Sequence, residues 1–359
     1  MMRRREFITL FGSAASMPVL SWPLAARAEA KPKMLRVGYV GVQSPDAPLY
    51  KAFRDRMAEL GYQDGRNFNF EYIQTPDIEG YGPAYRELAA RKVDVFFAVG
   101  EPGLRAAQAA AGALPIALLA VDFDPMAKGY VASLARPGGN VTGIVVQQME
   151  LAAKRIELLR EVLPDAHRIG LVSDALSSDQ IDTAAGAARS LGFVPLLVEL
   201  SGPHPDYIAA LRRMGDAQAV VIPAGPLFMR DRVAIAEALT QAGIPSICAF
   251  REIAEAGALM SYGVDLAALF RDMADYVDRI AKGGKPADLP IEHATRFHMA
   301  INLKAALRLG VSVSNAFAAR ANVVIECGDA ISSLCSAARR RGRSRRARSS
   351  PTGFGASAC

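Results

Sequence analysis

The sequence has few cysteines and histidines. Four of each occur among 359 residues, and three of the cysteines lie in the last 33 residues, which leaves Cys248 alone in the rest of the chain. There is no CxxC pair, and a spacing of five does not place the neighbouring His293 and His298 on one helix face. These absences argue against a disulfide framework and a metal site, so we expect no metal and no cofactor.

Motifs of common enzyme classes are also missing. The chain has no GxSxG, no P-loop and no GxGxxG after a predicted strand. Asp122 and Asp124 alternate along one segment, which is poor geometry for an acid–base pair. We therefore predict that the protein is not an enzyme.

The net charge of +6 resides in the two ends of the chain. The first 28 residues hold four arginines and one glutamate, and the last 33 hold seven arginines and one aspartate. Residues 29–326 consequently carry a net charge of −3. A slightly acidic core gives no support for nucleic-acid binding.

The N-terminus has the three parts of a bacterial export signal. Arg4–Ile8 is typical of the twin-arginine type, Thr9–Leu24 is mildly apolar, and Ala26–Ala28 fits a cleavage site. The alternative is a membrane anchor, but the apolar run is shorter than the ~20 residues that span a bilayer. It also contains Pro18 and Pro23. We predict that residues 1–28 are a signal cleaved near Ala28 and that the protein works in the periplasm.

The middle of the chain alternates apolar, β-branched runs with amphipathic helical patterns. This alternation indicates an α/β fold with parallel sheets. The predicted strands are Leu35–Val40, Asn67–Tyr72, Val93–Val99, Ile116–Val121, Val141–Val146, Arg168–Val172, Val194–Val198, Ala219–Ile222, Ser246–Phe250, Leu259–Gly263 and Phe297–Asn302, and the predicted helices include Tyr50–Leu60, Tyr81–Arg91, Glu150–Val162, Arg230–Ala242, Leu266–Lys282 and Leu303–Leu309.

The pattern is repeated with an offset near 130 residues. Val37–Gly41 matches Ile169–Ser173, and Val93–Gly100 matches Ala219–Gly225. Two tandem copies of one α/β lobe explain the offset. After Gly257 the repeat ends, and we expect the remaining segment to cross back and complete both lobes.

An ordered series of motifs then resembles a known family. The motifs include ELGY at Glu59–Tyr62, LARPGGNVTG at Leu134–Gly143, KRIELL at Lys154–Leu159, AGALMSYG at Ala256–Gly263 and KPADLPIE at Lys285–Glu292. With them the chain resembles the ABC-transporter substrate-binding proteins of the tryptophan/tyrosine-binding type. The resemblance implies the type I periplasmic-binding-protein fold, in which two Rossmann-like lobes with parallel sheets are joined by a three-strand hinge.

The resemblance also implies how the chain is organised. We expect lobe one to comprise residues 35–145 and 257–284, and lobe two to comprise residues 146–256 and 285–326. We expect residues 327–359 to form a disordered basic tail. A ligand would bind in the cleft between the lobes.

Ligands of open parallel sheets bind beyond the carboxyl ends of the strands. In lobe one this predicts Ser44, the segment Gly100, Glu101 and Pro102, and the pair Asp122 and Phe123 as ligand-binding residues. Ser44 is placed either to cap the next helix or to face a ligand. Asp122 is placed to pair with a ligand ammonium and Phe123 to stack on it, whereas Asp124 fits a helix-capping turn.

In lobe two the same rule predicts Asp174 and Gly225, and Tyr262 either lines the hinge or belongs to the core. Glu101 and Asp174 depart from the family pattern, which has a small hydroxyl residue and an asparagine there. The added negative charge favours a cationic or amine-bearing ligand, although Glu101 also suits the helix dipole alone.

The leading prediction is a periplasmic solute-binding protein that captures a small organic solute, amino-acid-like molecules among the candidates, for an ABC importer. Its expected partners are that small-molecule solute and an ABC permease in the inner membrane, with no nucleic acid and the protein as a monomer. The alternatives are a ligand-sensing module for a membrane receptor and, third, an enzyme.

Overall fold

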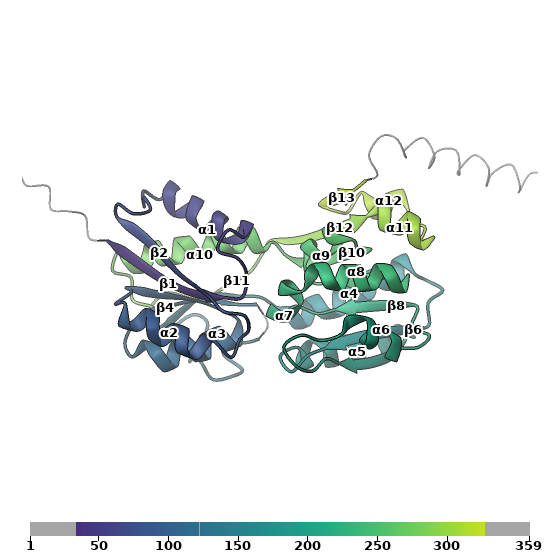
Figure 1. Ribbon diagram of the computed structural model, residues 1–359, viewed down its shortest axis with the longest axis horizontal. Coiled ribbons are helices and arrows are strands. Elements are labelled where there is room, and N and C mark those ends of the chain that lie inside the picture. The colour runs from purple at the N-terminus through teal and green to yellow at the C-terminus, as the bar shows by residue number, and fades with distance from the viewer. Residues whose placement is uncertain (1–33, 122, 327–359) are drawn as a thin grey trace, which may run out of the picture. The chain divides into compact units, whose positions relative to one another are not determined.

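The computed structural model describes residues 34–121 and 123–326. They form two sheets of mostly parallel strands, and helices that alternate with the strands along the chain cover the faces of each sheet (Figure 1). This confirms the predicted α/β class. The predicted signal (residues 1–28), the predicted tail (327–359) and Asp122 lie outside the described residues. No helix within these ranges is long and apolar enough to cross a membrane.

The first sheet has the strand order β11-β5-β4-β3-β1-β2. Helices α2 and α3 cover one face and helices α1 and α10 the other, as Figure 1 shows. The elements are β1 (Leu35–Gly41), α1 (Pro48–Glu59), β2 (Phe68–Gln74), α2 (Tyr81–Ala90), β3 (Val95–Val99), α3 (Gly100–Ala111), β4 (Ile116–Ala120), β5 (Val141–Val145), α10 (Leu266–Ala281) and β11 (Glu292–His293). We call this sheet with its helices lobe one.

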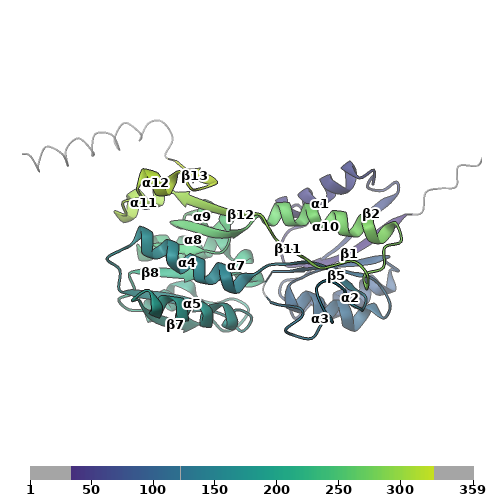
Figure 2. The same ribbon diagram turned by 180° about the vertical axis from the view of Figure 1, so that it is seen from behind.

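The second sheet has the order β13-β12-β10-β9-β8-β6-β7. Helices α4 and α5 pack on one face and α6, α8 and α9 on the other; Figure 2 brings α4 and α5 to the front. The elements are α4 (Gln148–Val162), β6 (Arg168–Ser173), α5 (Ser178–Ser190), β7 (Val194–Glu199), α6 (Tyr207–Arg213), β8 (Ala219–Ile222), α7 (Pro226–Arg230), α8 (Arg232–Ala242), β9 (Ser246–Cys248), α9 (Arg251–Ala256), β10 (Met260–Val264), β12 (Phe297–Asn302), α11 (Leu303–Leu309), α12 (Asn315–Ala318) and β13 (Val323–Ile325). We call this sheet with its helices lobe two.

The two sheets repeat one topology, as the 130-residue offset predicts. Reading from the outer edge, the order is second, first, third, fourth and fifth strand in both, beginning with β2 and β7. All neighbours within these five-strand sets are parallel. The order reverses at β1 and at β6, and such reversals are where doubly wound folds bind ligands.

The chain passes between the sheets three times, as the resemblance implies. The passages are residues 146–147, Asp265 and residues 294–296. Two elements differ from the expected assignment: β10 lies in the second sheet between β9 and β12, and β11 pairs with β5 in the first. Strand β10 follows β9 and α9 of lobe two and pairs with β9, as successive strands of a βαβ series usually do. The chain passes to lobe one only after β10 ends.

The predicted helix Arg230–Ala242 corresponds to α8, and only its first residue, Arg230, belongs to the preceding helix α7. Helix α7 ends at Arg230 and α8 begins at Arg232, with Asp231 between them at φ −94° and ψ 16°. The predicted start is therefore two residues early, and the predicted end at Ala242 is the observed one.

A buried arginine in lobe two connects the chain segments next to the first and second passages. Arg155 of α4 is 1% exposed. Its Nε donates to the carbonyl oxygen of Tyr262 at 2.8 Å, and its Nη2 donates to Oε1 of Gln148 at 3.0 Å. Burial lowers the pKa of Arg155 to about 10. These bonds fasten the start of α4, just after the first passage, to β10, just before the second.

Candidate ligand-binding cleft

Three adjoining cavities lie at the carboxyl ends of the strands. Their volumes are about 350, 60 and 630 Å³. The first and second share Val42 and Pro226, and the first and third share Ile78 and Leu176. The three cavities therefore adjoin one another, and each has walls from both lobes; we call the three together the cleft.

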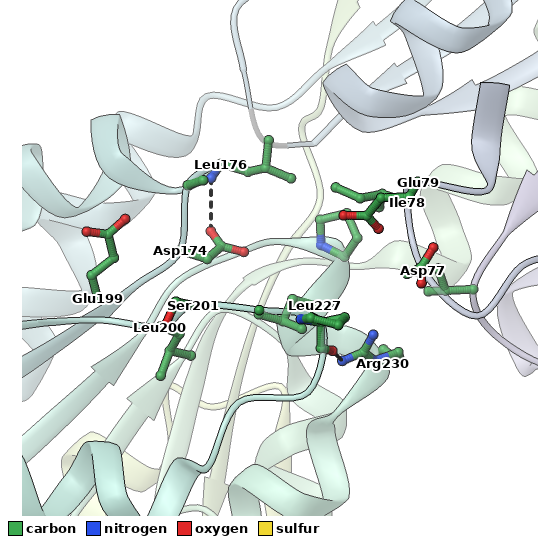
Figure 3. A pocket seen from close by; sticks show the side chains of 15 residues that line it. Asp77, Ile78, Glu79, Asp174, Leu176, Glu199, Leu200, Ser201, Leu227 and Arg230 are labelled. Atoms are coloured by element: carbon green, nitrogen blue, oxygen red, sulfur yellow. Dashed lines mark hydrogen bonds between the residues drawn. The ribbon is translucent and has the colours of Figure 1, made fainter.

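The first cavity is built on the ends of five strands. Lobe one contributes Val42 after β1 and the segment Asp77–Glu79 after β2. Lobe two contributes Asp174–Leu176 after β6, Glu199–Pro203 beginning with the last residue of β7, and helix α7 after β8. Figure 3 shows these side chains converging from both sides. The cavity thus spans the switch points at β1 and β6.

The polar groups of the first cavity are mostly acidic. Four carboxylates line it, and a single guanidinium, that of Arg230, opposes them. The four acidic residues are Asp77, Glu79, Asp174 and Glu199.

Asp174 is the most buried of these carboxylates, at 8% exposed. Its Oδ1 accepts the backbone N–H of Leu176 at 3.2 Å, and its own N–H donates to Oγ of Ser177 at 2.9 Å. Figure 3 shows the other oxygen pointing away from Leu176, toward the side of the cavity that Ile78 and Glu79 line. That oxygen, Oδ2, accepts no hydrogen bond from the part of the chain that the structure describes.

Arg230 is already neutralised by its neighbour. Its Nε lies 2.6 Å from Oδ1 of Asp231 and its Nη2 lies 2.8 Å from Oδ2. The hydroxyl of Tyr207 donates to the same carboxylate at 2.8 Å, and Arg230 also donates to the carbonyl of Pro203. Hydrogen bonding to Asp231 raises the pKa of Arg230, and the negative charge of Asp77 adds to the shift.

The second cavity is aromatic. Tyr39, Tyr50, Tyr81, Phe250 and Phe270 line it, and the ring centroids of Tyr39 and Tyr50 are 5.1 Å apart. Burial raises the pKa of Tyr39 and of Tyr50 well above the usual value, so both hydroxyls stay protonated at neutral pH. This cavity therefore presents ring faces and neutral hydroxyls.

The third cavity contains charges of both signs. Glu101, Pro102, Arg105 and Lys128 line it. Oε1 of Glu101 accepts the hydroxyl of Tyr130 at 2.8 Å, and Lys128 Nζ lies 3.9 Å from Glu101 Oε2. Burial and this hydrogen bond raise the pKa of Tyr130 to about 12. Glu101 is thus held by protein partners at the start of α3.

Four of the predicted site residues line the cleft. Asp174 lies in the first cavity, Gly225 in the second, and Glu101 and Pro102 in the third. Gly225 precedes α7, and a Cβ there would lie 3.2 Å from the ring of Phe228, so the position is tight for any larger residue.

Ser44 and Gly100 do not line these cavities. Ser44 is exposed, and its Oγ accepts the N–H of Asp46 at 3.3 Å. The capping alternative for Ser44 is wrong, because the N-cap of α1 is Ala47 and no side chain caps the helix. Gly100 is buried at φ +71°, a left-handed conformation that favours glycine where β3 turns into α3.

Phe123 and Tyr262 belong to the packed interior. Phe123 is 4% exposed, with its ring edge-on to Tyr130 at 5.6 Å. Tyr262 is half-buried and packs against two core clusters, which agrees with the alternative that it belongs to the core. Asp124 forms the predicted turn, since its Oδ1 accepts the N–H groups of Met126 and Ala127 at 2.8 and 3.1 Å. It caps no helix, because residues 125–129 form a turn.

Sequence reasoning missed the loops after β2 and β7. Asp77–Glu79 and Glu199–Pro203 both line the first cavity. The signal was available, because both follow predicted strands and the rule about carboxyl ends applies to them equally.

Residues 34–121 and 123–326 contain no group of three or more potential metal-ligating side chains.

The cleft and the duplicated sheets agree with a family match. A family model described as ABC transporter substrate binding protein matches residues 44–325. The chain belongs to this family. The resemblance read from the sequence motifs is thereby confirmed.

Individual relatives support the fold. A tyrosine-binding protein of Clostridioides difficile (strain R20291) is 24% identical over 259 residues, 70% of this chain and 73% of that protein. A crystal structure from Vibrio cholerae and one from Streptococcus pneumoniae in complex with L-Trp both align with a TM-score of 0.74. They are 24% and 22% identical, cover 81% and 82% of this chain, and are each covered completely.

Proposed function

We propose that the protein is a periplasmic solute-binding protein that captures a small organic molecule between its lobes and delivers it to an ABC permease. The observation that carries this proposal is the first cavity, whose walls come from both lobes at the switch points of both sheets. A site shared in this way couples ligand binding to lobe closure, because the ligand contacts both walls only when they are close.

The same proposal covers the ends and the assembly of the chain. The export signal in residues 1–28 would direct the protein to the periplasm and be removed near Ala28. The mature protein would work as a monomer without catalytic activity. Membership of a family of transport proteins supports both the permease partner and the absence of catalysis.

The ligand class follows from the cavity walls. Asp174, which is 8% exposed, offers a carboxylate oxygen to a ligand amine, and the aromatic second cavity adjoins the first through Val42 and Pro226. A tyrosine-binding relative and a structure in complex with L-Trp are consistent with an amine joined to an aromatic body. Glu101, Pro102 and Gly225 would complete the cleft around it.

A ligand screen tests the binding role. The mature protein is heated with amino acids, amines, aromatic acids, sugars and polyamines in turn, and hits are measured by calorimetry. A ligand at 100 times its Kd adds about 2.7 kcal/mol to the free energy of unfolding, which raises the Tm. A screen without any hit contradicts the proposal.

Delivery to a permease needs a separate test. Uptake of the radiolabelled hit is compared between cells that lack the gene and cells that carry it. We expect uptake to fall to background without the protein. Unchanged uptake would contradict the transport role while leaving the binding role intact.

A further inference from the structure

We propose that the ligand of the first cavity is an organic cation that carries no carboxylate, such as a primary amine on an apolar or aromatic body. This inference rests on the proposed binding function and narrows it. It distinguishes an amine from the corresponding amino acid, which has the same side chain and the same amino group but adds an anionic group.

The one guanidinium that lines the first cavity, that of Arg230, is already paired with one of the protein's own carboxylates. Arg230 is held by Asp231 through two contacts, at 2.6 and 2.8 Å, and Tyr207 fixes that carboxylate from a third direction. A ligand carboxylate would have to compete with Asp231 for the guanidinium. Displacing it would leave Asp231 without its cation in a half-buried position.

A carboxylate of the protein already lies just before the start of α5, which is Ser178. Backbone N–H groups at a helix N-terminus bind anions. Here the carboxylate of Asp174 accepts the N–H of Leu176, and the carbonyl oxygen of Asp174 accepts the N–H of Ser177 at 3.2 Å. An incoming carboxylate would therefore meet a negative charge where the fold would otherwise attract an anion.

A cation meets the opposite situation. Oδ2 of Asp174 accepts no hydrogen bond within the described ranges although the residue is 8% exposed, and it faces the cavity. An ammonium group supplies a hydrogen-bond donor and a positive charge to this oxygen, and charged hydrogen bonds are among the strong ones. Glu79 and Glu199, from the two opposite lobes, add to the negative potential of the same cavity.

The remaining wall selects an apolar body of limited size. Most of the other lining residues are apolar, and a volume of about 350 Å³ lies at the lower end of the range for small-molecule sites. These residues include Val42, Ile78, Leu176, Leu200, Pro203 and Leu227.

Matched pairs of compounds test the inference by calorimetry on the mature protein. The pairs are tryptamine with tryptophan and tyramine with tyrosine; indole-3-acetate supplies the carboxylate without the amine, and putrescine and choline are aliphatic cations. We expect at least one of these cations to bind. An aromatic amine that binds should do so at least about tenfold more tightly than its amino acid, the equivalent of one charged hydrogen bond.

Two results would overturn the inference while the binding function stands. One is an amino acid that binds as tightly as its amine, and the other is a hit confined to sugars or carboxylates. A blank for these probes and for the broad screen contradicts both the inference and the proposed function.

Variants then assign the effect to residues. Asp174→Asn should weaken binding of the best amine by about 10- to 100-fold. Glu199→Gln, at an exposed position, should weaken it by a smaller factor and serves if Asp174→Asn does not fold. The control is Asp165→Asn, since Asp165 precedes β6 at the opposite edge of the sheet and lines none of the cavities described above. Unchanged amine binding in both cavity variants overturns the inference.

Asp231→Asn tests the rejection of carboxylates. It removes the charge that neutralises Arg230, so the ratio of amine to amino-acid affinity should fall by about tenfold. A ratio that stays the same would show that Asp231 does not exclude the carboxylate, and would overturn that part of the inference.

Discussion

The two lobes share a strand order but fill their cores differently. Every aromatic ring pair among the described residues lies in lobe one, where Tyr39, Phe97 and Phe270 form part of one cluster. At the equivalent positions of β6 and β8, lobe two has Leu171 and Val221 in a mostly aliphatic core cluster whose buried aromatic residues are Phe193 and Phe317. One topology therefore tolerates either filling, because apolar character and total volume matter more than side-chain identity.

The two lobes are alike in having a glycine at a position where a neighbouring backbone leaves no space for a Cβ atom. The fifth strand of each contains a glycine close to the passage that follows it, Gly143 in β5 and Gly263 in β10. A Cβ at Gly143 would lie 1.9 Å from the carbonyl oxygen of Leu118, and one at Gly263 would lie 2.0 Å from that of Ala249. Both copies keep the backbone constraint although their side chains have diverged.

The largest expected effect comes from breaking this shared constraint. Gly143→Ala and Gly263→Ala should each lower the free energy of unfolding by about 3 kcal/mol or more, since a backbone oxygen cannot move aside as a side chain can. At Gly143 the φ of +147° would add backbone strain to the substituted alanine. Urea denaturation followed by far-UV circular dichroism measures the loss.

A third glycine is the matched control. Gly186 lies inside α5, and a Cβ there would meet nothing within 4 Å. Gly186→Ala should therefore raise stability by up to about 1 kcal/mol through helix propensity. Equal effects of all three substitutions would contradict the role given to the strand glycines.

Exchanging the core side chains tests the difference between the lobes. Phe97 is fully buried, with its ring centroid 5.1 Å from those of Tyr39 and Phe270. Phe97→Val leaves a cavity and should lower the free energy of unfolding by about 2 to 4 kcal/mol. Val221→Phe should cost about 1 to 3 kcal/mol in lobe two by overpacking.

The same denaturation curves measure both exchanges. A loss below about 0.5 kcal/mol, the usual range for a surface substitution, would mean that the core relaxes around the exchanged side chain. That result in either lobe would remove the distinction between an aromatic and an aliphatic core.

The smallest expected effect concerns helix capping. Asp206 of lobe two accepts the N–H of Ala209 at 2.9 Å, so Asp206→Ala should lower stability by about 1 kcal/mol. Ser44→Ala in lobe one should change it by less than about 0.5 kcal/mol, because Ser44 does not cap α1. Thermal unfolding by calorimetry compares the two, and a larger loss for Ser44→Ala would contradict this assignment.

Much of the cleft was predictable because it depends on strand ends. Alternating apolar runs located β1, β6 and β8 to within a residue at their ends, and the carboxyl-end rule then identified Asp174 and Gly225. Phe123 shows the limit of that rule. It follows β4, yet its ring turns into the core against Tyr130, a choice that depends on packing partners seven residues away.

The sequence by itself determined the fold class, the duplication and the family, because periodicity, repeat offset and local motifs are properties of neighbouring residues. Only the tertiary structure decided which sheet receives β10 and β11, since strand pairing joins segments far apart in the chain. It also decided the charge of the cleft. Asp77 and Asp174 lie almost a hundred residues apart yet line one cavity, and the pairing of Arg230 with Asp231 leaves that cavity acidic.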